Sequence, residues 1–266
     1  MKLAVIGSPI AHSLSPVMHR AALDALGRTD VTYEAIDVVD LAATLPRLQR
    51  EGYVGLNVTL PHKTAVIAHL ASIDDTARAI GAVNTLSLGA SGWTGTNTDA
   101  LGLARSLVEA GVVVDGARVV VLGAGGAARA SVVAMRSAAQ LVVVARRIEA
   151  ARDVAALHPN ATAQTFAARD LGDADLVIQA SSATLGAGAE DFVRALPLDA
   201  LRADAVVVDL VYRPRETALL ARARARGLRT VDGVGMLVHQ GAASLERWIG
   251  EAPPIDVMRA AVLRAL

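Results

Sequence analysis

The chain has 266 residues, which is enough for two modest domains or one large one. Its 26 basic and 26 acidic side chains cancel, so the sequence offers no basic field for nucleic acid and no attraction to an anionic membrane surface. Hydrophobic residues make up 53% of the chain and cysteine is absent, which excludes disorder, disulfides, thiolate catalysis and cysteine-ligated metal centres.

The first apolar run, Leu3–Ile6, is predicted to be a buried strand and is too short for the apolar region of a signal peptide. No other apolar run reaches the roughly 18 residues that a membrane-spanning helix needs. We therefore expect a cytoplasmic protein that binds neither a membrane nor nucleic acid. As separate expectations, the protein is a monomer or homodimer that acts on a small molecule and needs no metal.

Short apolar runs alternate with longer stretches of helical period, a pattern typical of an α/β fold with a mostly parallel sheet. In the N-terminal part, Ser15 and Pro16 predict the start of a helix and Gly27 its end. Further strands are predicted at Tyr33–Ile36 and Val54–Val58, with a helix around Leu41–Leu48 between them.

The segment Ser91–Gly102 is rich in Gly, Thr and Asn, and we place a domain boundary there. A compact series of βαβ units follows, which is typical of a nucleotide-binding domain. Its predicted strands are Arg118–Leu122, Leu141–Ala145, Asp175–Gln179 and Ala205–Leu210, and its predicted helices are Leu103–Ala110, Ala127–Ser137, Ile148–Leu157 and Ala221–Arg226. The last two helical stretches, near Met236–Trp248 and Ile255–Leu266, are expected to pack on the first domain.

A glycine-rich loop follows the first strand of this second domain and opens a helix, which is the context that a dinucleotide-binding G-x-G-x-x-A motif requires. Small residues let backbone amides approach a pyrophosphate at the helix N-terminus, where the helix dipole also favours negative charge. A tight structural turn is the alternative. The residues expected to hold the cofactor here are Gly123, Ala124, Gly125, Gly126 and Ala127.

Two arginines follow the next strand, at the place where an NAD-binding site usually has an acid against the ribose. The guanidinium groups of Arg146 and Arg147 suit a 2′-phosphate, and the nearest acid, Glu149, lies further along the helix. This favours NADP over NAD. The alternative is a solvated helix start, although cations there oppose the helix dipole.

Several segments of the first domain are more polar than their surroundings. Ser13 and Ser15 could hold a carboxylate, or Ser15 could be a helix N-cap. The segment 57–63 ends a strand and is predicted to begin a helix, which places Lys63 in a first turn where the dipole disfavours it unless a negative group compensates. Asp99 is a candidate partner for Lys63, or an N-cap of the helix that follows.

Taken in order, these segments resemble the shikimate dehydrogenase family, NADP-dependent enzymes of aromatic amino-acid biosynthesis, over nearly the whole chain. The matching segments are Ser13-x-Ser15, Asn57-Val58-Thr59-x-Pro61-x-Lys63, Gly81-Ala82-Val83-Asn84-Thr85, Asn97-Thr98-Asp99-x-x-Gly102, the glycine-rich loop, Asp209-x-x-Tyr212-x-Pro214 and Gly235-Met236-Leu237-x-x-Gln240.

The resemblance implies reversible reduction of 3-dehydroshikimate to shikimate by NADPH. It implies two α/β domains around a cleft: a substrate domain of residues 1–101 and 237–266, and a doubly wound Rossmann-like NADP domain of residues 102–236. Lys63 and Asp99 are then the catalytic pair. The implied substrate-binding residues are Ser13, Ser15, Thr59, Lys63, Asn84, Asp99, Tyr212 and Gln240, and Gly233 and Met236 join the glycine-rich loop and the arginines at the cofactor.

The chain departs from the family pattern in the nucleotide domain. The family usually has Asn-Arg-Thr where this chain has Ala145-Arg146-Arg147, and Asn-Ala-Thr-Ser where it has Gln179-Ala180-Ser181-Ser182. Quinate dehydrogenase, which acts on a saturated relative of the same ring, is the nearest alternative enzyme. A non-catalytic NADP-binding sensor is another, although a sensor would need neither Lys63 nor Asp99.

The implied chemistry needs an acid that protonates the oxygen of the ring ketone as it becomes negative. A lysine ammonium is charged at neutral pH and can donate that proton. We expect Lys63 to donate it and Asp99 to orient both Lys63 and the substrate hydroxyl.

Overall fold

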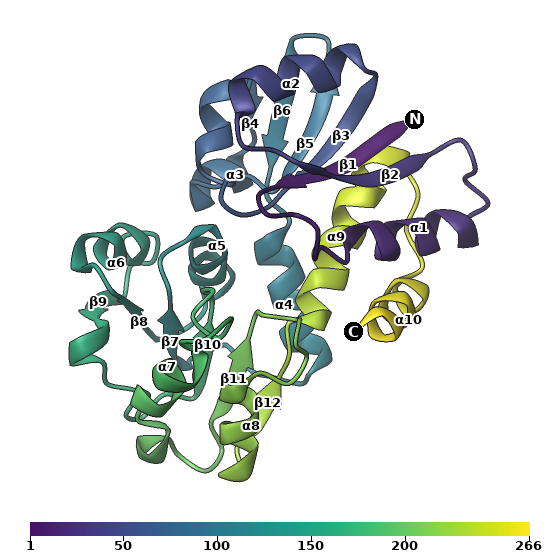
Figure 1. The fold of residues 1–266 in the computed structure, drawn as a ribbon. Coiled ribbons are helices and arrows are strands. Elements are labelled where there is room, and N and C mark those ends of the chain that lie inside the picture. Colours follow the sequence, from purple (N-terminus) through teal and green to yellow (C-terminus); the bar gives the residue numbers. More distant parts are fainter. The chain divides into compact units, whose positions relative to one another are not determined.

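The computed structural model describes residues 1–266, and they form two compact units. Unit 1 consists of residues 1–102 and 238–265, and unit 2 consists of residues 103–237 together with Leu266 (Figure 1). The chain passes between the units twice, within helix α4 (Asp99–Glu109) and within helix α9 (Val234–Ile249). No helix combines the length and the apolar character needed to cross a membrane.

Unit 1 is built on a six-stranded sheet with the order β2-β1-β3-β5-β6-β4. Strands β1, β2 and β3 are parallel, whereas β5 runs antiparallel to both β3 and β6. The elements are β1 (Lys2–Gly7), α1 (Ser15–Ala25), β2 (Thr32–Asp37), α2 (Leu41–Arg50), β3 (Tyr53–Val58), η1 (Ala65–His69), β4 (Ser72–Ile73), α3 (Asp75–Ile80), β5 (Thr85–Gly89), β6 (Gly92–Thr96) and, at the C-terminus, α10 (Ile255–Ala265).

Successive side chains of a strand point to opposite sides of the sheet. The central strands are apolar on both sides, so this sheet has two apolar faces. Ala4 and Ile6 of β1 pack in one buried cluster with Leu45 and Leu48 of α2. The other face meets α1 and the C-terminal half of α9, where the indole nitrogen of Trp248 donates a 2.9 Å hydrogen bond to the carbonyl oxygen of Leu86 on β5. Both faces of the sheet are therefore buried.

The segment 91–102, in which the domain boundary is predicted, contains strand β6, and the first part of unit 1 ends at its last residue, Gly102. Gly95 lets β6 pack closely, because a Cβ there would lie 2.6 Å from Leu70. Two other local predictions in unit 1 are wrong. Ser15 is not an N-cap, since the cap position is Leu14 and no side chain caps the helix. Residues 61–64 form turns followed by a 3₁₀ helix, so Lys63 does not lie in the first turn of an α-helix.

Unit 2 contains a fully parallel sheet with the order β12-β11-β10-β7-β8-β9. Counted within the unit, this is the 3-2-1-4-5-6 order of a Rossmann fold, with its switch point between β7 and β10. The elements are β7 (Arg118–Leu122), α5 (Gly126–Ala134), β8 (Gln140–Ala145), α6 (Ile148–Ala155), β9 (Ala161–Thr165), η2 (Phe166–Ala168), β10 (Leu176–Gln179), α7 (Ala189–Ala195), η3 (Leu198–Ala200), β11 (Val206–Asp209), α8 (Ala218–Ala225) and β12 (Arg229–Val231).

The strands of unit 2 are runs of Val, Leu and Ile because helices cover both faces of a parallel sheet. Val119 and Val121 of β7 face a cluster that includes α5 and α6, whereas Val120 and Leu122 face a cluster that includes α7 and α8. This confirms the predicted α/β class and the doubly wound arrangement. Buried area on both faces fixes the register of β7, and with it the place where the following loop begins.

Candidate active site

Lys63 and Asp99 form a buried ion pair in unit 1. The Nζ atom of Lys63 donates a hydrogen bond of 2.6 Å to Oδ2 of Asp99, and the two side chains are 16% and 3% exposed. Lys63 follows β3 through a turn, and Asp99 is the first residue of α4. A carboxylate this deeply buried requires a charged or hydrogen-bonding partner, because an isolated buried charge is costly. The ammonium supplies that partner.

The second oxygen of Asp99 is held by an amide. The Nδ2 atom of Asn84 donates to Oδ1 of Asp99 at 2.9 Å, to Oγ1 of Thr98 at 2.9 Å and to Oε1 of Gln240 at 3.2 Å. The backbone amide of Asp99 donates to the side-chain oxygen of Asn97 at 2.9 Å, which fixes the start of the helix. Asp99 is therefore oriented from both oxygens and from its backbone, and it does not act as a free helix cap.

Behind this pair lies a buried hydrogen-bond network of residues that come from five segments of unit 1. Asn57, at the end of β3, accepts a hydrogen bond of 2.6 Å from the Tyr33 hydroxyl and donates to Ser244 Oγ at 3.0 Å. Ser244 also lies 2.7 Å from Thr85 Oγ1 and 3.2 Å from Thr98 Oγ1. Each of these five side chains is almost fully buried. Such a network fixes the positions of its side chains, because each polar group is hydrogen-bonded to another member of the network.

Ser13, Ser15 and Thr59 are the other predicted substrate-binding residues of unit 1. Ser13 lies in the loop before α1, and its hydroxyl accepts the backbone amide of Ser15 at 3.3 Å. Ser15 is buried, and its backbone carbonyl oxygen lies 2.8 Å from Nδ1 of His19. Thr59 follows β3 directly and is half-buried, and its backbone amide donates to the carbonyl oxygen of Ile6 at 2.9 Å. Gln240 lies on α9, four residues before Ser244.

In unit 2 the glycine-rich loop has a geometry that fits a pyrophosphate. Gly123 has φ +128°, and a Cβ there would lie 3.0 Å from the carbonyl oxygen of Ala180, so the loop requires glycine. Gly125 caps α5 without a side-chain hydrogen bond, and no atom lies within 4 Å of where its Cβ would be. The first amides of α5, at Gly126 and Ala127, therefore begin a helix beside open space, which suits an anionic ligand.

Arg146 and Arg147 lie at the carboxyl end of β8, the strand next to β7. Both side chains are exposed, and neither guanidinium group makes a hydrogen bond or ion pair within the chain. Arg147 occupies the N-cap position of α6, where its side chain caps nothing. Two unpaired guanidinium groups beside the glycine-rich loop match the additional phosphate that distinguishes NADP from NAD.

The remaining predicted residues of unit 2 lie after β11 and at the start of α9. Asp209 organises the loop that carries Tyr212, because its carboxylate accepts the backbone amide of Val211 at 3.0 Å and the Thr217 hydroxyl at 2.8 Å. Burial raises the pKa of Asp209. A Cβ at Gly233 would lie 2.3 Å from the carbonyl oxygen of Leu210, so this position requires glycine for close backbone approach. Met236 packs in the apolar cluster of unit 2.

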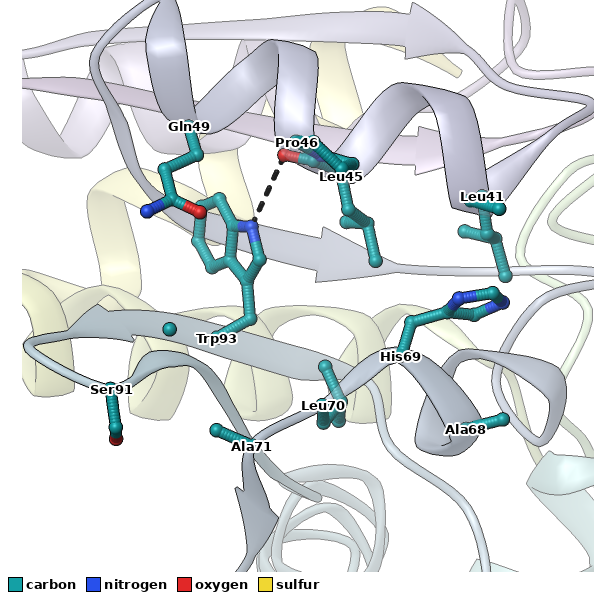
Figure 2. A pocket seen from close by; sticks show the side chains of 12 residues that line it. Leu41, Leu45, Pro46, Gln49, Ala68, His69, Leu70, Ala71, Ser91 and Trp93 are labelled. Atoms are coloured by element: carbon teal, nitrogen blue, oxygen red, sulfur yellow. Dashed lines mark hydrogen bonds between the residues drawn. The ribbon is translucent and has the colours of Figure 1, made fainter.

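A pocket of about 400 Å³ lies elsewhere in unit 1, between α2 and the segments 68–71 and 91–93. Figure 2 shows Trp93 at its wall, with the indole nitrogen donating to the carbonyl oxygen of Leu45 at 3.3 Å. No carboxylate, ammonium or guanidinium group lines this pocket, and none of the predicted site residues does. It therefore offers no acid–base pair for catalysis.

Sequence reasoning missed Ser244 and did not single out Tyr33 as part of the site. Ser244 stands among alanines in a helical stretch, and one serine in such a stretch carries no signal of function. Tyr33 lies in a predicted strand, where an aromatic residue is most simply a core residue. Asn57 was recognised as part of a polar segment, but its contact with α9 depends on the return of the C-terminal helices to unit 1.

Comparison with known proteins gives a consistent result. Two family models match: the shikimate dehydrogenase substrate binding domain at residues 5–86 and the shikimate 5′-dehydrogenase C-terminal domain at residues 233–263. The shikimate dehydrogenase (NADP⁺) of Symbiobacterium thermophilum is 42% identical over 283 aligned positions, which cover 99% of this chain and 94% of the relative.

Solved structures agree with the sequence comparison. Shikimate 5-dehydrogenase from Thermus thermophilus, in complex with NADP(H) and shikimate, has a TM-score of 0.86 and 38% identity, with 100% of both chains covered. Quinate dehydrogenase from Corynebacterium glutamicum, in complex with NAD, has a TM-score of 0.85 and 30% identity, with 99% of both chains covered. The fold is thus shared by enzymes that act on related ring substrates with different cofactors.

Proposed function

The chain belongs to the shikimate dehydrogenase family, and we propose that unit 1 binds and protonates the substrate while unit 2 binds NADP. The enzyme is an NADP-dependent oxidoreductase that interconverts 3-dehydroshikimate and shikimate in aromatic biosynthesis. The observation that carries the assignment of roles is the buried Lys63–Asp99 pair, with Nζ and Oδ2 separated by 2.6 Å.

Reduction of the ketone requires a proton at the oxygen that becomes negative. NADPH, when bound, supplies the hydride for the ring carbon. The Lys63 ammonium donates a proton to the substrate oxygen, which completes the hydroxyl group and leaves Lys63 as a neutral amine. Asp99 holds Nζ in place, and its other oxygen is kept in position by the Asn84 amide. In the oxidative direction the neutral lysine takes the proton back.

Hydroxyl and amide groups around the pair suit a polyhydroxylated ring acid. Ser13 and Ser15 donate to the carboxylate. Thr59, Gln240 and Asp99 bind the ring oxygens, and Asn84, whose amide donates to Thr98 and Asp99, holds Asp99 in position. Neutral hydroxyl donors are suitable for a carboxylate because hydrogen bonds to a charged group contribute about 1.5–3 kcal/mol each.

The cofactor is assigned to the glycine-rich loop and the adjacent arginines. Gly123, Gly125 and the start of α5 hold the pyrophosphate, and Arg146 and Arg147 hold the 2′-phosphate. Gly233 and Met236, at the start of α9, also contact the cofactor. The fit depends on features of this chain: a glycine with φ +128°, an uncapped helix start and two unpaired guanidinium groups.

The experiment that tests this function measures the rate at which shikimate and quinate are oxidised with NADP and with NAD. The absorbance of the reduced cofactor reports each rate. The proposal predicts that shikimate with NADP gives the highest kcat/KM of the four combinations. A preference for quinate would show that the chain is a quinate dehydrogenase instead. Binding of NADP without turnover of either substrate would support a sensor instead.

A further inference from the structure

We propose that Ser244 is a positioning residue for the Lys63–Asp99 pair, acting through Thr98 and Asn84; the inference rests on the function proposed above. Ser244 lies on α9, is fully buried and has no contact with Lys63 or Asp99 themselves. Its hydroxyl meets four polar groups: the Asn57 amide at 3.0 Å, Thr85 Oγ1 at 2.7 Å, Thr98 Oγ1 at 3.2 Å and the Gln240 carbonyl oxygen at 3.0 Å. These contacts tie together three segments that surround Asp99.

The hydrogen-bond inventory of Asn84 explains why the Ser244 hydroxyl matters. The Asn84 amide has two protons but three acceptors within reach, namely Thr98 Oγ1, Asp99 Oδ1 and Gln240 Oε1. With Thr98 Oγ1 held at 2.9 Å, one proton is used there and the other points at Asp99. Thr98 Oγ1 also lies 3.2 Å from Ser244 Oγ, so Ser244 helps to hold in place the acceptor of one of these two protons.

Without the Ser244 hydroxyl, two constraints are lost together. Asn57 loses the shortest of its three donor contacts, since the Asn84 carbonyl oxygen and Thr85 Oγ1 lie at 3.2 and 3.4 Å. Thr98 loses its link to α9, and because the backbone amide of Thr98 donates to Oδ1 of Asn84 at 2.8 Å, a shift of Thr98 moves the Asn84 amide that donates to Asp99. Asp99 then loses a donor that keeps it aligned with Lys63, and proton transfer slows.

The test compares Ser244→Ala and Thr98→Val with Ser131→Ala as a matched control. Ser131 is also a fully buried helical serine, and its hydroxyl donates to the carbonyl oxygen four residues earlier at 2.9 Å, but it lies in unit 2 outside the network. We expect Ser244→Ala to lower kcat about tenfold, the worth of one hydrogen bond in a transition state, with the KM for NADP nearly unchanged. Ser131→Ala should lose as much thermal stability as Ser244→Ala, but its kcat should stay within about twofold of the parent's.

The double variant separates a shared network from independent damage. If Ser244 and Thr98 act on one path, Ser244→Ala with Thr98→Val lowers kcat about as much as either change alone, rather than by the product of the two. A parent that turns over shikimate, and loses that turnover in Lys63→Ala, shows the proposed function to be sound. In such an enzyme, an unchanged kcat in Ser244→Ala, or multiplicative effects in the double variant, overturns the inference.

Discussion

At the scale of single residues, Lys63 and Asp99 are the proposed acid–base pair, and their side chains are partly and almost fully buried. Asp99 is 3% exposed and receives hydrogen bonds on both oxygens. Removing the charge of either partner leaves the other charge uncompensated, which is costly at a site shielded from solvent. Asp99→Asn keeps the shape of the side chain and removes the charge that orients the ammonium, so its effect on turnover reports on orientation.

Ser15→Ala should act on substrate affinity. We expect the KM for shikimate to rise roughly 10–150-fold, because a hydroxyl that holds a carboxylate contributes in the ground state and the transition state alike. Ser15 is not the N-cap of α1, so no capping energy is lost with the hydroxyl. Steady-state kinetics in both substrates check this, with the KM for NADP as the internal control. A normal KM for shikimate would remove Ser15 from the carboxylate site.

Replacing Arg146 and Arg147 together by alanine should reduce cofactor discrimination. If each guanidinium contributes about 1.5 kcal/mol at this exposed site, the parent prefers NADP by about 10²-fold in kcat/KM, and the double variant loses most of that preference. Use of NAD should change little. Added salt should weaken the parent's preference, because exposed charges are screened.

Arg152→Ala is the matched control for that change, since Arg152 is exposed in the last turn of α6, the helix that follows the two arginines. It should retain the parent's preference for NADP. A parent that uses NAD and NADP equally well would show that the arginine pair does not read the 2′-phosphate.

Among the elements, helix α1 carries a buried histidine that makes stability depend on pH. Burial lowers the pKa of His19 from 6.5 to about 4. Its ring stacks on Tyr33 with centroids 3.9 Å apart, and its Nδ1 atom lies 2.8 Å from the Ser15 carbonyl oxygen. The folded protein therefore keeps this imidazole neutral in a range where the unfolded chain protonates it.

The sign of the dependence follows from that difference. As pH falls from 6.5 toward 4, the unfolded chain binds the proton first, so the free energy of unfolding decreases by about 3 kcal/mol from this group. His19→Gln should show a shallower decrease across the same range, whereas His12→Gln, at an exposed position, should follow the parent. Denaturant titrations at several pH values measure this. Identical slopes in the parent and His19→Gln would show that His19 is not the titrating group.

The elements also show how far sequence reasoning reaches. The βα pattern of unit 2 was predictable because buried parallel strands are short runs of Val, Leu and Ile, as in Arg118–Leu122. The hairpin of β5 and β6 was not, since Gly95 weakens a strand pattern and only the packing of Leu70 and Val83 against it explains the glycine. Polar motifs identified Lys63 and Asp99, but the contact of Ser244 with Asn57 spans 187 residues and needs the tertiary fold.

At the scale of the whole molecule, the predicted roles follow the division into two units. The residues predicted to bind the substrate lie in unit 1, except for Tyr212, and the glycine-rich loop with its arginines lies in unit 2. Each unit has its own apolar clusters around its own sheet. A change at the acid–base pair should therefore leave the cofactor site intact.

The most direct test of this account measures turnover and NADP affinity in the same preparation of Lys63→Ala. Loss of the proton donor should lower the single-turnover rate roughly 10²–10⁴-fold, the usual contribution of general acid–base catalysis, while the Kd for NADP stays near that of the parent. A rate within about threefold of the parent would show that Lys63 does not transfer the proton. A parallel loss of NADP affinity would contradict the separation of roles between the two units.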